Sequence, residues 1–224
     1  MEIGDRVTIY SLNCWQWLVS YFAVHKLGAV ANPINVMLTP EEVAFVVEDC
    51  GAKVILATRD KGEPLLGMRG KGTLREIVIF DEEVPVDAIS FGRLLEESSP
   101  TFTIRDVPTD ALSTICYTSG TTGHPKGAKH SHRNVLMNAS MIATMTVRTQ
   151  HDTVVSALPC PHVYGNLVFM SAFLYGMTLV LLPSFDEEQV LRAIQDNKAT
   201  LFEGVPTMFM YLLAHPEFDS YDLS

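Results

Sequence analysis

The chain has 224 residues, 47% of them hydrophobic and 19% charged, a composition typical of a globular protein with a sizeable core rather than of a disordered one. Sixteen basic residues stand against twenty-six acidic ones, so the formal net charge is −10. Because nucleic acids are held by basic surfaces, this balance excludes nucleic-acid binding as the main role. It leaves room for a local anion site, since a few backbone N–H groups and one lysine can hold a phosphate.

The cysteine pattern predicts a cytoplasmic protein, and the two long uncharged stretches are too interrupted to predict membrane spans. The four cysteines are far apart and form no C-x-x-C pair, which favours reduced thiols that pack as small hydrophobic residues. Residues 7–24 and 163–184 carry no Asp, Glu, Lys or Arg, but polar or glycine residues interrupt both. We therefore expect strand and helix units there rather than transmembrane helices. The acidic start of the chain does not resemble a secretory signal.

In the first half of the chain, short apolar strands alternate with amphipathic helices. We expect strands at residues 6–12, 29–31, 53–57 and 76–80, and helices at residues 15–27 and 39–50. The second helix has strong end signals, with Thr39 as its cap, Pro40 in its first turn and Gly51 just past its end. Residues 81–108 are rich in acids, Ser and Pro, which predicts a surface connection with one short helix near residues 91–97.

The same alternation resumes after residue 110. We expect strands at residues 112–117, 153–158, 177–182 and 200–203, and helices at residues 134–145, 163–175, 186–196 and 206–214. This pattern predicts an α/β fold with largely parallel sheets flanked by helices. The acidic connection divides the chain into a first α/β sub-region, residues 1–105, and a second, residues 106–224, which carries the segment described next.

The segment YTSGTTGHPKG, from Tyr117 to Gly127, lies between a predicted strand and a predicted helix. Its three glycines allow a sharp turn and a close approach to a ligand, its four hydroxyl side chains add donors, and Lys126 adds a positive charge. This combination predicts a phosphate-binding loop rather than a surface turn of small residues. It is not a Walker A loop, because Lys126 is followed by Gly127 and the glycine spacing differs.

Together with Asp110-Ala111-Leu112, this segment resembles the AMP-binding signature of adenylate-forming enzymes, which include acyl-CoA synthetases, luciferases and the adenylation domains of peptide synthetases. The resemblance implies that the chain is part of the family's large N-terminal domain. It also implies that the loop binds the β- and γ-phosphates of ATP and releases pyrophosphate. It makes Lys126 catalytic and gives Thr118 a contact with Mg²⁺. The ATP-binding residues that it implies are Thr118, Ser119, Gly120, Thr121, Thr122, Gly123, Lys126 and Gly127.

Other segments agree with this family. Residues 4–42 resemble the early part of acyl-CoA synthetases, and residues 204–208 resemble a later segment. The sequence LPCPHVYG, residues 158–165, resembles the proline–x–x–histidine motif beside the acyl pocket. A histidine among apolar residues is usually a core residue, but this one lies between a strand end and a helix start, which favours a substrate-facing catalytic role. The implied substrate-binding residues are His162, Val163, Tyr164 and Gly165.

The resemblance implies an activity that uses a small-molecule carboxylic acid, ATP with Mg²⁺, and CoA. The acid and ATP would give an acyl-adenylate and pyrophosphate, and CoA would then take the acyl group as a thioester. Apolar residues in the predicted helices at 163–175 and 206–214 favour a fatty or other hydrophobic acid. The resemblance is compatible with a homodimer and with peripheral contact to a membrane surface.

Several later parts of the family pattern do not occur in this sequence. They are a tyrosine–glycine–x–threonine–glutamate segment, a ribose-binding aspartate, and a small C-terminal domain with a catalytic lysine. We therefore expect the C-terminal part of the large domain and the small domain to be absent, and this chain alone to be inactive. Two alternatives stay open: an acyl-AMP ligase or luciferase-like adenylating enzyme, and a truncated, non-catalytic module that binds an acyl group or phosphate.

Overall fold

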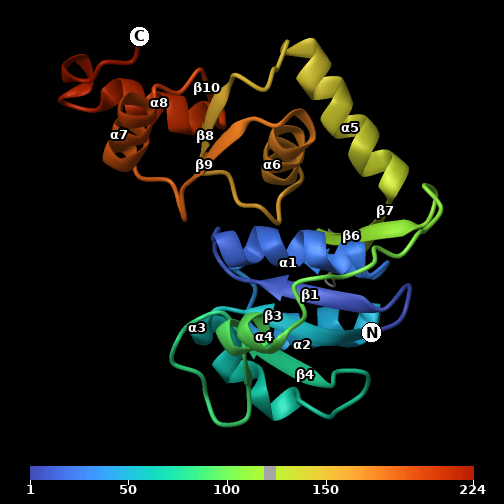
Figure 1. Ribbon diagram of the computed structural model, residues 1–224. Helices are drawn as coiled ribbons and strands as arrows, with labels where there is room; N and C mark the ends of the chain where they lie inside the picture. The colour runs from blue at the N-terminus through green and yellow to red at the C-terminus, as the bar shows by residue number, and fades with distance from the viewer. Residues whose placement is uncertain (119–124) are drawn as a thin grey trace. The chain divides into compact units, whose positions relative to one another are not determined.

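The fold is taken from a computed structural model that describes residues 1–118 and 125–224. The chain forms two compact units, Met1–Arg133 and Asn134–Ser224, hereafter the first and second units. The boundary lies after residue 133 rather than near residue 105. The reason is that the strands following the acidic connection pair with the sheet of the first unit. The predicted α/β fold with mostly parallel strands is confirmed (Figure 1).

Among residues 1–118 and 125–133, seven strands form one sheet in the order β5-β4-β3-β1-β2-β6-β7. Every neighbouring pair is parallel except β6 and β7, which are antiparallel. Most of these strands are short apolar runs that are largely buried, as expected for a sheet covered on both faces. Their bounds are β1 Arg6–Tyr10, β2 Val30–Pro33, β3 Ala52–Ala57, β4 Glu76–Ile79, β5 Ile89–Ser90, β6 Leu112–Thr118 and β7 Lys126–Ser131.

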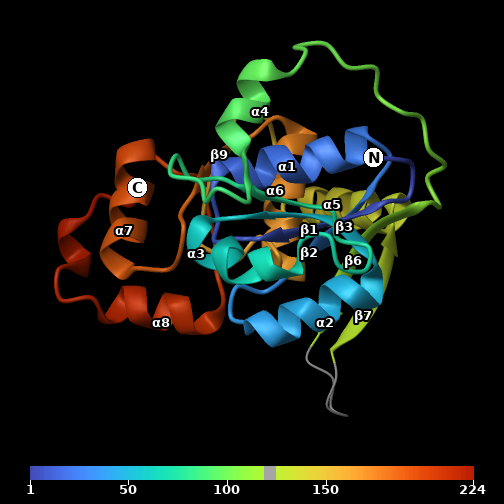
Figure 2. The same cartoon turned by 90° about the horizontal axis from the view of Figure 1, so that it is seen from below.

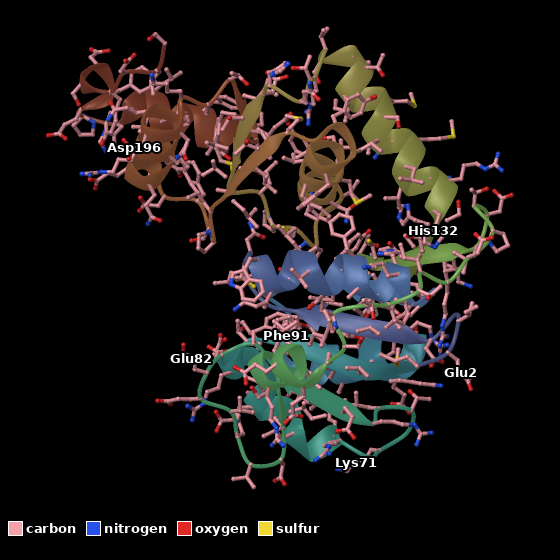
Figure 3. All side chains as sticks on the ribbon, in the orientation of Figure 1. Glu2, Lys71, Glu82, Phe91, His132 and Asp196 are labelled. Atoms are coloured by element: carbon pink, nitrogen blue, oxygen red, sulfur yellow. The ribbon has the colours of Figure 1, made fainter. Side chains whose placement is uncertain are left out.

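Helices cover both faces of this sheet, with α1 and α4 on one face and α2 on the other (Figure 2). Phe91 begins α4 and makes edge contacts with Trp15 and Phe80, at ring-centroid distances of 5.9 and 5.1 Å (Figure 3). The helices of this unit are α1 Trp15–Lys26, α2 Pro40–Cys50, α3 Arg59–Gly62 and α4 Phe91–Glu97, with a 3₁₀ helix η1 at Glu63–Met68.

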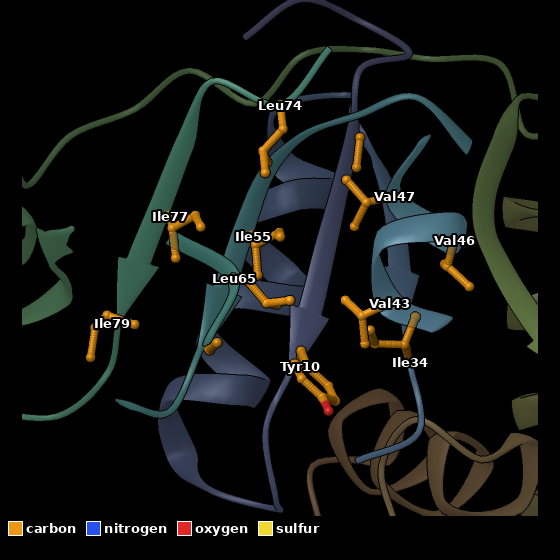
Figure 4. Packing of buried hydrophobic residues seen from close by; sticks show 12 residues of the cluster. Tyr10, Ile34, Val43, Val46, Val47, Ile55, Leu65, Leu74, Ile77 and Ile79 are labelled. Carbon is orange, nitrogen blue, oxygen red and sulfur yellow. The ribbon is translucent and has the colours of Figure 1, made fainter. Parts of the chain in front are cut away.

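The ends of α2 follow from local chemistry. Thr39 Oγ1 accepts a hydrogen bond from Glu42 N at 3.3 Å, and Glu42 Oε2 accepts one from Thr39 N at 2.8 Å, which completes a capping box. Gly51 ends the helix in the left-handed region, with φ +66°. Between these ends, α2 places a row of valines against the sheet (Figure 4). The core side chains that meet there include Val43, Val46, Val47, Ile55, Leu65, Ile77 and Ile79.

The second unit contains a three-stranded parallel sheet, in the order β10-β8-β9, with helices packed on it. Its strands are β8 Thr153–Ser156, β9 Thr178–Leu181 and β10 Leu201–Glu203. Its helices are α6 Val163–Tyr175, α7 Glu187–Asn197 and α8 Pro206–Ala214, with a 3₁₀ helix η2 at Phe218–Ser220, and the unit boundary falls in the first turn of α5 His132–Met145. Apolar side chains of α6 and α8 meet the strands in one cluster, and those of α7 and α8 meet them in another.

Two observations bear on the predictions about membranes and cysteines. No helix in the described ranges is both long and apolar enough to cross a bilayer, and residues 163–181 form α6, a turn and β9. All four cysteines lie in the described part of the chain and none forms a disulfide. Cys160 is buried and the other three are partly buried. Burial raises the pKa of the Cys50 and Cys116 thiols to about 11, so both stay protonated at neutral pH.

His25 of α1 is held as a neutral imidazole. Its Nδ1 donates to the carbonyl oxygen of Tyr21 at 2.7 Å, so its Nε2 accepts the hydroxyl of Ser113 at 2.8 Å. The ring of His132, labelled in Figure 3, is 5.3 Å away between centroids. Burial lowers the pKa of His25 to about 4, and repulsion from His132 acts in the same direction.

A pH-dependent loss of stability follows from this histidine. In the unfolded chain the pKa of His25 is about 6.5. Below that pH the unfolded state therefore binds a proton that the folded state does not bind. The free energy of unfolding therefore falls as the pH drops from about 6.5 towards 4, and His25 accounts for about 2 kcal/mol between pH 7.5 and 5. Denaturant unfolding should show that the difference in unfolding free energy between wild type and His25→Gln is about 2 kcal/mol smaller at pH 5 than at pH 7.5. A constant difference for His25→Gln would contradict the prediction.

Candidate functional site

The hairpin of β6 and β7 carries the described ends of the predicted phosphate loop. Thr118, the last residue of β6, pairs with Lys126, the first residue of β7, and both are exposed. Because β6 runs parallel to β2, this end of the hairpin lies at the carboxyl end of the parallel strands. Open α/β sheets bind ligands at that edge. The structure thus brings Thr118 and Lys126 together where a phosphate site is expected.

Gly127 is required by close packing inside the hairpin. A Cβ atom at this position would lie 2.8 Å from Ile115 Cγ2 and 3.1 Å from Tyr117 Cζ. The glycine therefore allows β7 to approach the side chains of β6, a reason that differs from contact with a phosphate. Five of the predicted ATP-binding residues lie outside the described residues, so their roles stay predictions: Ser119, Gly120, Thr121, Thr122 and Gly123.

Tyr117 connects the hairpin to α2. Its ring lies against Gly127, and its hydroxyl donates a hydrogen bond to the carboxylate of Asp49, near the end of α2. Burial, followed by the hydrogen bond to Asp49, raises the pKa of Tyr117 above its ordinary value. This contact could not be predicted from the sequence, because the two residues are 68 positions apart and no motif links them.

His162 caps the amino end of α6. It follows β8 at the carboxyl end of that strand, and its Nδ1 accepts a hydrogen bond from the backbone N–H of Tyr164 at 3.2 Å. In the neutral ring the proton is therefore on Nε2, which is a donor. The side chain is exposed rather than buried in the core. This geometry fits a group that presents an N–H to a ligand.

A buried charged network lies directly behind this cap. The hydroxyl of Tyr164 donates to one oxygen of Glu203, and Arg148 pairs with the other oxygen. The Arg148 side chain is only 1% exposed, and its Nη1 donates to Ser171 Oγ at 2.5 Å. Burial, with a further contribution from Glu203, raises the pKa of Tyr164 to about 12. No motif predicted this network, although an acid that ends the apolar strand β10 is a sequence signal for a buried pair.

The other predicted substrate-binding residues differ in exposure. Val163 is exposed, Tyr164 is half-buried and Gly165 is buried. A Cβ atom on Gly165 would lie 2.1 Å from the carbonyl oxygen of Pro159, so the glycine lets α6 approach the turn that follows β8. Lys126 belongs to the first unit and His162 to the second.

The described residues contain no group of three or more His, Cys, Asp or Glu side chains that could hold a metal ion. Mg²⁺ that enters with a nucleotide needs only one or two protein ligands, because phosphate oxygens and water supply the rest. The exposed hydroxyl of Thr118, opposite Lys126, is an oxygen donor of the kind that fits such a shared site.

Comparisons with known proteins place these features in a family. The family model described as "AMP-binding enzyme" matches residues 1–224. A long-chain-fatty-acid CoA ligase of Bacillus subtilis is 29% identical over the whole chain, and a feruloyl-CoA synthase of Amycolatopsis is 31% identical over 99% of it. The chain spans 45% and 42% of these relatives.

The fold agrees with the same family. The crystal structure of the N-terminal domain of FACL13 from Mycobacterium tuberculosis, with an inhibitor bound, matches the whole chain with a TM-score of 0.90 and 28% identity. The match covers 55% of that domain. The chain therefore belongs to the family of AMP-binding enzymes, and the curated relatives described above are a CoA ligase and a CoA synthase.

Proposed function

We propose that this chain provides the phosphate-binding part of an ATP-dependent acyl-CoA synthetase. The whole protein would join a carboxylic acid to AMP with release of pyrophosphate, and then transfer the acyl group to CoA as a thioester. The observation that carries the proposal is the β6–β7 hairpin, which sets Thr118 opposite Lys126 at the carboxyl edge of a parallel sheet. Membership of the AMP-binding family gives this hairpin its chemical interpretation.

Electrostatics explains why adenylation needs such a hairpin. An anionic carboxylate must approach the charged triphosphate of ATP, so the negative charge has to be offset by donors and cations fixed in advance. Lys126 would supply one positive charge at the β- and γ-phosphates, and Thr118 a hydroxyl oxygen to Mg²⁺. When bound, Mg²⁺ supplies further charge neutralisation on the phosphate oxygens.

His162 and the helix that it caps are the proposed acid-binding elements. The Nε2–H of His162 would donate to the carboxylate, while Val163 and Tyr164 would line the acyl group. Because the hydroxyl of Tyr164 already donates to Glu203, the tyrosine offers mainly hydrocarbon to a ligand. The helix α6 itself is apolar, with Val168 and Phe169 buried. These features favour a fatty or other hydrophobic acid.

Two further proposals concern the setting of the reaction. The four cysteines without a disulfide support a reducing compartment, so we place the enzyme in the cytoplasm. The chain spans less than half of the curated relatives given above, so we also propose that the 224 residues alone are inactive. Turnover by the isolated chain above the level of its Lys126→Ala variant would refute the second proposal.

The test is acid-dependent exchange between ATP and pyrophosphate, measured on the longest protein that contains this chain, with short, medium, long and aromatic acids. Exchange should depend on one class of acid, and Lys126→Ala should lower it roughly 10²–10³-fold, as expected when a fixed cation for the transition state is lost. Lys129→Ala is the matched control, because Lys129 is an exposed lysine on the same strand, three residues from Lys126. It should keep nearly full exchange.

The outcomes separate the competing functions. Exchange followed by thioester formation with CoA supports the synthetase, whereas exchange with another acyl acceptor would assign an acyl-AMP ligase or a luciferase-like enzyme. No exchange with any acid, from folded protein, would overturn the proposal in favour of a non-catalytic binding module. Equal losses in Lys126→Ala and Lys129→Ala would remove Lys126 from the catalytic role.

A further inference from the structure

One side chain joins three elements at the base of the phosphate hairpin. Tyr117 is the last residue of β6 but one, and its ring covers Gly127 on β7. The ring also packs against the core cluster beneath α2, and its hydroxyl donates to Asp49. Since Tyr117 precedes Thr118 and Gly127 follows Lys126, the contact lies one residue from each functional side chain.

Asp49 occupies a position that its own helix disfavours. It lies in the last turn of α2, where the carbonyl groups give the helix end a partial negative charge, and no basic residue is present in that turn. Glu48, its neighbour, adds a second negative charge. Within the described residues Asp49 has no ion pair, and the hydrogen bond that the structure gives its carboxylate comes from Tyr117. An acid at this place therefore serves the hairpin rather than the helix.

We propose that Tyr117 and Asp49 are positioning residues that fix the phosphate-binding end of the β6–β7 hairpin for ATP. The inference rests on the proposed function, because it assigns the hairpin to ATP. The ring of Tyr117 holds Gly127 from one side, and the hydrogen bond to Asp49 holds the ring against α2. Thr118 and Lys126 are thus fixed relative to the rigid core before the nucleotide binds.

Such an anchor acts by preorganisation. A hairpin end that is free to move must be ordered when ATP binds, and that ordering weakens binding of the nucleotide but not of the acid. Tyr117→Phe keeps the ring over Gly127 and removes only the hydroxyl. We expect it to raise the KM for ATP roughly tenfold, the scale of one hydrogen bond to a charged group, and to leave the KM for the acid unchanged.

Asp49→Ala should weaken ATP binding at a small cost in stability. It removes the acceptor, so the KM for ATP should rise about as much as in Tyr117→Phe. It also removes an unfavourable charge from the end of α2, which offsets part of the stability lost with the hydrogen bond, so the unfolding temperature should fall less than in Tyr117→Phe. The double variant should bind ATP no worse than either single variant, because both remove the same contact.

Two matched controls separate positioning from general damage. Glu48→Ala removes the same charge from the same helix end without touching Tyr117. Tyr10→Phe removes a tyrosine hydroxyl from the same core cluster, where it donates to the carbonyl oxygen of Leu38 at 2.6 Å. Both controls should keep the wild-type KM for ATP in the pyrophosphate exchange assay with the longest protein that contains this chain. An unchanged KM in Tyr117→Phe, or equal effects of Asp49→Ala and Glu48→Ala, would overturn the proposal.

A second readout does not depend on turnover. Amide hydrogen exchange of β7, measured on a peptide that covers residues 125–131, should be faster in Tyr117→Phe and Asp49→Ala than in wild type or either control. If wild type shows no pyrophosphate exchange but β7 loses protection in both variants, the anchor stands and the proposed ATP function fails. If wild type is active and β7 keeps its protection in both variants, the anchor fails and the function stands.

Discussion

Replacing Arg148 with alanine is expected to lower the free energy of unfolding by about 3–5 kcal/mol. The guanidinium is almost completely buried and bonds to Glu203, to Ser171 Oγ at 2.5 Å and to Thr146 Oγ1 at 2.8 Å. Without it, the carboxylate of Glu203, which is mostly buried, keeps only the hydroxyl of Tyr164 as a described partner. An uncompensated buried charge is far more costly than a lost surface contact.

Equilibrium unfolding in denaturant measures this effect, and the chain offers a matched control. Arg192 pairs with Glu188 one turn away on α7, with both side chains more than half exposed, so Arg192→Ala should cost about 0.5 kcal/mol or less. The double change Arg148→Met with Glu203→Gln should recover much of the loss, because no charge is then left buried. A cost for Arg148→Ala as small as that for Arg192→Ala would show that the buried pair does not hold in the folded protein.

Local signals explain which parts of the fold could be predicted from sequence. The helix α2 follows from a capping box at Thr39 and a left-handed Gly51, both visible as residue types at the right spacing. Likewise, α6 and α8 begin and end at the predicted residues. The strand β7 was not predicted, because its sequence KGAKHS lacks the apolar alternation of a strand. Pairing with β6 across the hairpin, rather than propensity, makes it a strand.

The residues of the candidate site also include some that the sequence indicated and some that it did not. The motif indicated Thr118, Lys126, Gly127 and His162 because these residue types stand at a recognisable spacing. Their supports were missed because each depends on distant pairing. Arg148 and Glu203 are 55 positions apart. Sequence periodicity reports which face of an element is buried, but it does not report which two buried polar groups meet.

The family resemblance singled out Gly165, but the physical constraint on this residue comes only from the structure. The resemblance placed it beside a substrate, whereas the structure gives it a packing constraint. A Cβ atom there would lie 2.1 Å from Pro159 O and 2.7 Å from Pro159 C, both backbone atoms, so no side chain can rotate away to relieve the clash. The turn at Pro159 also accepts a hydrogen bond from His162 N at 2.9 Å. Any shift of α6 away from this turn therefore moves the histidine as well.

Gly165→Ala is accordingly expected to lower the free energy of unfolding by about 3 kcal/mol, at the upper end of the cost of overpacking. Gly92→Ala is the matched control, because Gly92 is also near the start of a helix and a Cβ there would meet only Ser90 Oγ, at 3.8 Å. That change should be neutral or stabilising, since alanine is the better helix former. Denaturant unfolding of both variants decides the point, and equal stabilities would show that α6 does not approach the Pro159 turn this closely.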